Sequence, residues 1–157
     1  RVMGINLKGA FLCCKHAIPY MQPSGGSIIN LASNAGILPR AHDPVYSTSK
    51  GALVAFTKSL ALCHSKDRIR VNTVCPGPVE NTRMMNRDLE STGDYDTAYQ
   101  ATLAASPMAK AEGRMIDVDE VAAAVLYLAG DAAKFVTGTD IAIDGGKSLG
   151  VPPQKQI

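Results

Sequence analysis

The chain has 157 residues, of which 46% are hydrophobic and 19% charged, a composition typical of one soluble globular domain. Its 16 basic and 14 acidic residues give a net charge of +2 and are spread along the sequence, so no basic footprint for nucleic acid or an anionic membrane is present. No apolar run reaches the roughly 18 residues of a membrane span. These properties exclude nucleic-acid-binding and membrane-spanning proteins.

The cysteines and histidines favour no metal site or disulfide, with a disulfide or a zinc site of the cysteines as narrower alternatives, and the first residue indicates that an N-terminal portion, with any targeting segment, is missing. No CxxC pair occurs, so the four cysteines are interpreted as small apolar side chains in a reducing compartment. His16, His42 and His64 lack metal-ligand spacing; His64 is expected to end a helix. No signal peptide precedes the first periodic segment, which favours a cytoplasmic protein. Because Arg1 is not methionine, we expect the chain to lack an N-terminal portion.

The first half of the chain predicts helices that alternate with strands. A helical period runs through residues 2–21, and residues 27–31 are a β-branched run typical of a buried strand. A long helix is predicted at residues 45–65, with Pro44 in its first turn. The next strand, residues 69–75, is stopped by a Pro-Gly-Pro turn.

The second half begins with a different kind of segment. Residues 79–115 are more polar and rich in methionine, and they contain two predicted short helices at residues 83–90 and 97–105. We expect this segment to cover a substrate site, with its methionines either lining that site or packing internally. A capped helix at residues 117–128, a strand at residues 139–143 and a loose tail at residues 151–157 complete the pattern. Asp117 is expected to cap this helix together with Glu120, and Asp144-Gly145-Gly146 is expected to close the strand.

Strands that alternate with long helices predict the α/β class, with right-handed crossovers and a parallel sheet covered on both faces. Three apolar strands make a thin sheet of this kind, and their edges need cover. We therefore expect the C-terminal part of a doubly wound, Rossmann-type sheet whose earlier strands precede residue 1.

A candidate proton-transfer site lies at one end of this sheet. Ser33 follows the first predicted strand, and Tyr46 and Lys50 lie four residues apart, on one face of the next helix. A neighbouring ammonium favours the ionised form of a phenol, so Lys50 would help Tyr46 to exchange a proton. The carboxyl ends of parallel strands are where such sheets bind ligands, so Ser33 is placed to hold a substrate oxygen.

Five motifs then show a resemblance that covers nearly the whole chain. They are INLKGAF at 5–11, GGSIINLAS at 25–33, YSTSK at 46–50, IRVNTVCPGPV at 69–79 and VTGTDIAIDGG at 136–146. Together they resemble the C-terminal portion of a short-chain dehydrogenase/reductase, of the 3-oxoacyl-acyl-carrier-protein reductase and glucose dehydrogenase type. The resemblance implies NAD or NADP as cofactor, a small alcohol or ketone as substrate, and a homodimer or homotetramer.

The resemblance also implies a role for each site residue. Tyr46 would be the acid/base, Lys50 would hold the nicotinamide ribose, and Ser33 would orient the substrate. Asn6 would hold a backbone kink and a water that passes protons to Lys50. The residues implied to lie near the nicotinamide are Pro76, Gly77, Val79 and, in place of the family's usual threonine at position 81, Asn81 or Thr82.

Other features leave narrower alternatives. The Gly-rich phosphate loop of the family, TGxxxGxG, is not in this chain, and we expect it among residues before Arg1. Ser47 to Lys50 matches the S-x-x-K motif of serine hydrolases, but the partner motifs S-D-N and K-T-G are absent. His42 could line the substrate pocket or simply be solvated. A second function class is a truncated, non-catalytic chain that acts only through subunit association.

Overall fold

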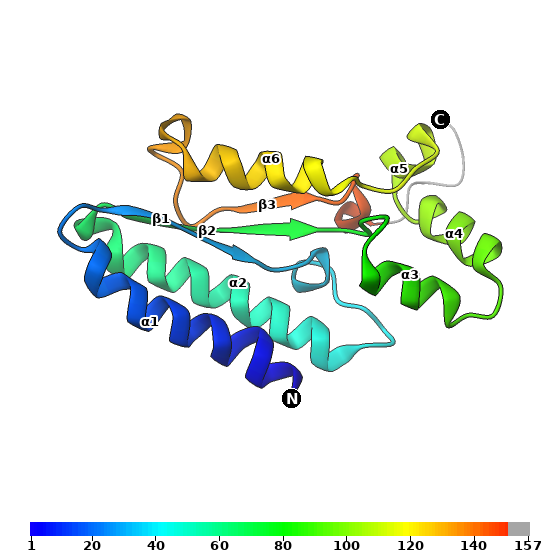
Figure 1. The fold of residues 1–157 in the computed structure, drawn as a ribbon, viewed down its shortest axis with the longest axis horizontal. Coiled ribbons are helices and arrows are strands. Elements are labelled where there is room, and N and C mark those ends of the chain that lie inside the picture. The colour runs from blue at the N-terminus through cyan, green and yellow to red at the C-terminus, as the bar shows by residue number, and fades with distance from the viewer. Residues whose placement is uncertain (151–157) are drawn as a thin grey trace.

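The computed structural model describes residues 1–150 as a parallel sheet with helices on both faces (Figure 1). The strands are β1 (Gly26–Leu31), β2 (Ile69–Pro76) and β3 (Asp140–Ile143), in the order β1-β2-β3. Gly26 of β1 lies opposite Ile69 of β2, and Thr73 of β2 lies opposite Asp140 of β3. This confirms the predicted α/β class and the three parallel strands. The tail expected at residues 151–157 lies outside the described residues.

The long helices cover the two faces of the sheet (Figure 1). Helices α1 (Ala10–Met21) and α2 (Pro44–His64) lie on one face, and α6 (Val118–Ala129) lies on the other. Three short helices lie beyond the carboxyl ends of the strands: α3 (Arg83–Glu90), α4 (Tyr95–Ala104) and α5 (Pro107–Glu112). Short turns complete the described part: η1 (Gly4–Gly9), η2 (Asn34–Gly36), η3 (Ser65–Asp67), η4 (Asp131–Ala133) and η5 (Lys147–Leu149).

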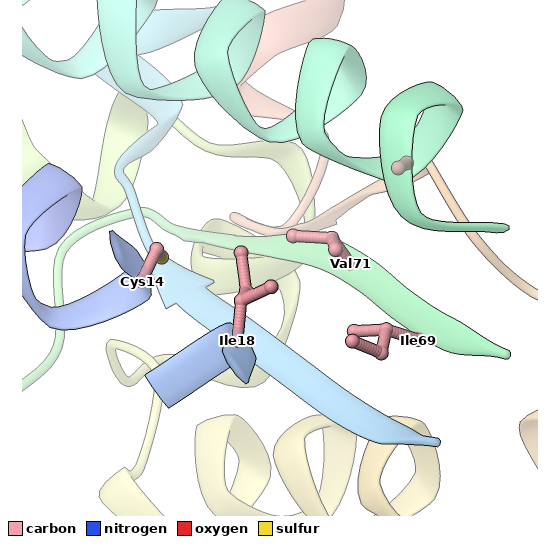
Figure 2. Close-up of a cluster of buried hydrophobic side chains, with 5 residues drawn as sticks. Cys14, Ile18, Ile69 and Val71 are labelled. Atoms are coloured by element: carbon pink, nitrogen blue, oxygen red, sulfur yellow. The ribbon is translucent and has the colours of Figure 1, made fainter. Parts of the chain in front are cut away.

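Apolar side chains join each layer of helices to the sheet. Figure 2 shows Cys14 and Ile18 of α1 beside Ile69 and Val71 of β2, all four less than 10% exposed. On the opposite face, Val74 of β2 packs against α6. Burial of this kind stabilises the fold by about 1.5–3 kcal/mol for each large apolar side chain. Both faces of β2 are therefore covered, so that even its polar Asn72 and Thr73 are fully buried.

Two elements differ from the prediction. The segment η1 is π-helical, where the apolar spacing predicts an ordinary helix from residue 2. The two short helices predicted at residues 83–90 and 97–105 are present as α3 and α4, but the third short helix of this segment, α5, was not predicted. Pro107 stands at its start and Gly113, with φ of 69°, ends it after six residues. A helix this short shows too little periodicity to be recognised from its apolar residues.

The predicted cap of α6 is confirmed and includes an ion pair. Asp117 and Glu120 form a capping box, and the Glu120 carboxylate also accepts hydrogen bonds from the Arg114 guanidinium at 2.8 and 3.0 Å. Arg114, followed by the Asp117 backbone N–H, lowers the pKa of Glu120 to about 2. The carboxylate is thus more acidic in the folded chain than in the unfolded one.

We expect Glu120→Gln to destabilise the full-length protein by about 0.5 kcal/mol at pH 7, the small value typical of a solvent-exposed pair. The stabilisation by Glu120 is complete above its unfolded pKa of about 4.5 and declines as the pH falls toward about 2. The difference in the free energy of unfolding between the wild type and Glu120→Gln, measured with urea, should therefore be smaller at pH 3 than at pH 7. Glu90→Gln removes an exposed carboxylate that forms no ion pair within residues 1–150 and is the control. A difference that stays constant with pH would contradict the prediction.

None of the helices in residues 1–150 combines the length and the apolar character that crossing a membrane requires.

Candidate active site

The turn that carries Ser33 is packed directly on the backbone of α2. Ser33 is 4% exposed and lies two residues after β1 ends, where its Oγ accepts a hydrogen bond from Ala35 N at 3.1 Å. A Cβ on Gly36 would lie 2.8 Å from the carbonyl carbon and oxygen of Lys50. Only glycine allows this approach, so the turn and the helix are fixed relative to each other at the candidate site.

Tyr46 and Lys50 lie in the first turns of α2, as the spacing predicts. The Asp43 carboxylate accepts a hydrogen bond from Tyr46 N at 3.1 Å and thereby caps the helix beside Tyr46. Lys50 Nζ lies 5.8 Å from the centroid of the Tyr46 ring and donates to the carbonyl oxygen of Leu31 at 2.9 Å. Burial lowers the pKa of Lys50 because it desolvates the ammonium. The last carbonyl of β1 therefore holds this ammonium beside the phenol.

Asn6 is connected to the same helix turn through Ser49. The Asn6 amide donates to Ser49 Oγ at 3.0 Å, and Ser49 Oγ donates to the carbonyl oxygen of Tyr46 at 2.7 Å. Ser49 is fully buried, so its hydroxyl depends on these partners. Asn6 itself lies inside the π-helical turn η1. Sequence reasoning did not identify Ser49, although its place between Tyr46 and Lys50 in the motif is a usable signal.

The end of β2 forms a tight junction with the end of β3. Gly77 N donates to the carbonyl oxygen of Ile143 at 2.8 Å, and a Cβ on Gly77 would lie 2.9 Å from the Cβ of Asp144. Asp144 is 3% exposed, and its carboxylate accepts hydrogen bonds from the backbone of Gly146 and Ser148. Pro76 and Gly77 thus lie at the carboxyl edge of the sheet, at the strand end next to that of β1.

The structure separates the two residues that the sequence left as alternatives for the nicotinamide. Asn81 has a φ of 59°, the left-handed conformation that asparagine tolerates better than most residues. Thr82 Oγ1 accepts a hydrogen bond from Met85 N and donates to the carbonyl oxygen of Val79, so Thr82 caps α3. The Thr82 hydroxyl is therefore engaged within the protein, while the Asn81 side chain forms no hydrogen bond within residues 1–150.

The segment expected to cover the site is tied together at its two ends by Glu80. The Glu80 carboxylate accepts hydrogen bonds from Tyr99 Oη at 3.2 Å and Met115 N at 3.1 Å. Burial, followed by the negative charge of Glu80, raises the pKa of Tyr99. Four methionines divide between two environments: Met115 and Met85 pack inside this segment with Leu89 and Leu103, whereas Met84 and Met108 are more than half exposed.

Two cations at this end of the sheet, Arg40 and Lys147, were not among the residues picked out from the sequence. The Arg40 guanidinium lies 5.6 Å from the centroid of the Tyr46 ring. Lys147 lies in η5, a turn that packs beside η2, and the charge of Arg40 contributes to a lowered pKa of Lys147. Arg40 stands in a loop and Lys147 follows the last strand, so neither belongs to a periodic pattern that would have indicated the site.

The remaining residues singled out from the sequence are a buried serine and two histidines. Ser47, the serine of the S-x-x-K pattern, is 7% exposed and accepts a hydrogen bond from Arg40 N at 3.0 Å. His42 is exposed in its loop, and His64 ends α2 with Nδ1 2.9 Å from Asp67. Within residues 1–150, no three His, Cys, Asp or Glu side chains gather closely enough to hold a metal ion.

One cavity lies near this end of the sheet but does not contain the candidate residues. It has a volume of about 400 Å³ and lies between α5, the start of α6 and the end of β3, with Ser106, Met115 and Ile143 in its lining. Ser33, Tyr46 and Lys50 do not line it. The candidate site is therefore the surface where η2, α2 and the ends of β1 and β2 meet.

Comparisons with known proteins agree with this architecture. The sequence pattern of the family described as enoyl-(acyl carrier protein) reductase matches residues 1–148. The meso-2,3-butanediol dehydrogenase of Serratia marcescens is 34% identical over 146 residues, which cover 93% of this chain and 54% of that protein. The ligand-free structure of the Thermoplasma acidophilum aldohexose dehydrogenase is 32% identical with a TM-score of 0.87, covering 97% of this chain and 60% of that one. The structure of ElxO with NADP bound is 27% identical with a TM-score of 0.81, and the match covers 92% of this chain and 56% of ElxO.

A parallel sheet covered by helices on both faces, with serine, tyrosine and lysine at its carboxyl edge, defines an α/β protein of the Rossmann type. The match of the family pattern to nearly all of the chain makes the identity specific: the chain belongs to the short-chain dehydrogenase/reductase family. The chain spans about half the length of the curated relatives it matches.

Proposed function

We propose that the complete protein is an NAD- or NADP-dependent oxidoreductase that interconverts a secondary alcohol and a ketone. The observation that carries the proposal is the fixed geometry of Ser33, Tyr46 and Lys50. The ammonium is held beside the phenol by the carbonyl of Leu31, and the serine turn is packed on the Lys50 backbone. The names of relatives agree with this reaction, since one acts on a butanediol and another structure contains NADP.

The residues of this chain would supply binding and proton transfer. The bound nicotinamide would take up or provide the hydride. Tyr46 Oη would accept the proton of the alcohol during oxidation and return it to the ketone oxygen during reduction. Lys50 would stabilise the phenolate by its charge, and Asn6 would support the same helix turn through Ser49.

Ser33 has a donor available for the substrate oxygen. Its Oγ accepts from Ala35 N, and the nearest acceptor for its proton, Asn34 Oδ1, lies 3.4 Å away. That separation is long for an O–H···O bond, whose usual range is about 2.5–3.0 Å. A substrate oxygen at a normal distance would therefore replace a poor hydrogen bond by a good one.

The nicotinamide would lie against the ends of β2 and β3. Gly77 has no side chain to exclude it, and Pro76 and Val79 offer apolar contact on either side of that glycine. We assign the polar contact at this edge to Asn81, because the Thr82 hydroxyl already caps α3. Residues 79–115 would cover the substrate above this surface, with the exposed Met84 and Met108 as its apolar contacts.

A second candidate function is subunit association without catalysis. Large apolar side chains are exposed on the outer faces of the helices and turns, among them Tyr20 (86%), Leu62 (84%) and Phe135 (96%). Such side chains fit a homodimer or homotetramer interface. Subunit association by itself would not interfere with catalysis, because these residues lie outside the candidate active site; the alternative is that association is the whole function.

The test is an assay of the full-length protein with NAD⁺ and NADP⁺ against a panel of secondary alcohols, followed by nicotinamide absorbance. We expect turnover with at least one cofactor and one alcohol. If no alcohol is oxidised and no ketone is reduced although titration calorimetry shows that the cofactor binds, the oxidoreductase proposal is wrong. An assembled protein that binds neither cofactor would instead favour association alone.

A further inference from the structure

Arg40 is held over the candidate acid/base by its own loop. Its backbone N donates to the buried Ser47 Oγ at 3.0 Å, which ties the loop to α2. From there the guanidinium lies 5.6 Å from the centroid of the Tyr46 ring, while Lys50 Nζ lies 5.8 Å from the same centroid. Two cations therefore lie close to the phenol ring, and of these Lys50 alone takes part in the proposed reaction.

Lys147 brings another cation to this place from the far end of the chain. It begins η5, which packs beside the turn η2 after Ser33. The side chain is half-buried, and burial, followed by the positive charge of Arg40, lowers its pKa. Two like charges brought together at the edge of the site raise the free energy of the empty protein. An anion bound between them would remove this cost.

The neighbouring carboxylates are already engaged elsewhere. Asp43 accepts from Tyr46 N, and both oxygens of Asp144 accept from the backbone of the turn that begins η5. Within residues 1–150, neither Arg40 nor Lys147 forms a salt bridge, whereas Lys58 and Arg114 do. Neither cation is therefore bound to a carboxylate of the described residues, although the charge of Asp144 acts on Lys147 in the direction opposite to that of Arg40.

We propose that the substrate is a hydroxy acid, or the corresponding oxo acid, whose carboxylate binds to Arg40 and Lys147 while its alcohol oxygen lies at Tyr46 and Ser33. The inference rests on the proposed function and names the substrate class of that same site. A guanidinium presents two parallel N–H donors that match the two oxygens of a carboxylate, and Lys147 adds a point charge. The anion would also fix which end of the substrate faces Tyr46, which orients the carbinol carbon.

The test compares acids with their neutral methyl esters in the full-length protein. The probes are 2-, 3- and 4-hydroxy acids with a secondary alcohol, each paired with its ester, at one ionic strength. We expect kcat/KM to favour one acid over its ester by about 10- to 100-fold, the range of a hydrogen-bonded charge pair. Arg40→Gln and Lys147→Gln should each remove most of this preference, mainly through KM for the acid. Turnover of the esters should fall much less than that of the acid, and the loss of preference should not be accompanied by a rise in the KM for the cofactor.

Lys134→Gln is the matched control, because it removes an exposed lysine near the amino ends of the strands, away from Tyr46. Equal use of acids and esters by the wild type would overturn the inference and leave the proposed function intact. A loss of ester turnover equal to that of the acid in Arg40→Gln would also overturn it, since the arginine would then be structural. A rise in KM for the cofactor alone would assign the pair to a cofactor phosphate instead.

A binding measurement covers the case in which no probe is turned over. Titration calorimetry of the wild type and of Arg40→Gln with the same acids and esters reports on the anion site without the reaction. Binding of an acid that is at least tenfold tighter than that of its ester, and that is lost in Arg40→Gln, would support the site although the proposed function had failed. Equal or absent binding of all the acids would overturn it.

Discussion

Replacing Tyr46 by phenylalanine in the full-length protein is expected to lower kcat at least about a hundredfold, the low end for loss of a general acid–base group. The substitution removes only the hydroxyl. The aromatic ring remains close to Arg40 and Lys50, whose charged atoms lie 5.6 and 5.8 Å from its centroid. The cap from Asp43 also remains, because it binds the backbone of residue 46. The loss should therefore appear in the rate and not in stability or cofactor binding.

The measurement is steady-state turnover together with urea unfolding and titration of the cofactor. Tyr20→Phe is the matched control, because Tyr20 is 86% exposed on α1 and forms no side-chain hydrogen bond within residues 1–150. It should keep the wild-type rate. Near-normal kcat in Tyr46→Phe would refute the assignment of this residue as the acid/base. A large drop in stability with a matching drop in rate would show that the hydroxyl acts in folding.

Elements whose limits are set by local chemistry were predicted closely from the sequence. Helix α2 begins at Pro44 after the capping Asp43, and α6 begins after the Asp117 capping box. Strand β2 ends at Pro76, where the Pro-Gly-Pro turn was expected to stop it. Ser33, Tyr46 and Lys50 could be placed because they stand at such limits, at a strand end and in the first turns of a helix.

Features that depend on contacts between distant segments could not be predicted. Apolar spacing is similar in a π-helical and an α-helical turn, so the widening at Gly4–Gly9 has no signature in the period. The partnership of Asn6 with Ser49 requires η1 to lie against α2. The charge of Arg40 acts on Lys147 only because β3 ends beside β2 and η5 folds back onto η2. The pair of cations from which an anionic substrate is inferred thus becomes visible only in the folded chain.

The close contact of Gly36 with α2 leads to the second large expected effect. A Cβ at Gly36 would lie 2.8 Å from the Lys50 carbonyl carbon and oxygen and 3.1 Å from Gly51 N. These are backbone atoms of a helix, which cannot turn aside as a flexible side chain could. Gly36→Ala must therefore push the Ser33 turn away from Tyr46 and Lys50.

We expect Gly36→Ala to destabilise the full-length protein by about 1–3 kcal/mol, as overpacking usually does. It should also lower kcat by about 10- to 100-fold, because a displacement near 1 Å can cost that much in a site that depends on position. Urea unfolding gives the first quantity and steady-state turnover the second. The loss in kcat should persist at temperatures where the variant is fully folded.

Gly51→Ala is the matched control on the other side of the same contact. A Cβ at Gly51 would lie 3.5 Å from the carbonyl oxygen of Gly36, an ordinary van der Waals distance, and the residue lies inside α2. Replacing a helical glycine by alanine stabilises a helix by about 0.5–1 kcal/mol, so this variant should gain stability and keep its activity. If Gly36→Ala lowers the stability while Gly51→Ala raises it, the close packing of η2 on the Lys50 backbone holds Ser33 in place. The number of glycines in the region would then not be the cause. Equal and small effects in both variants would mean that the turn can shift without disturbing the candidate site.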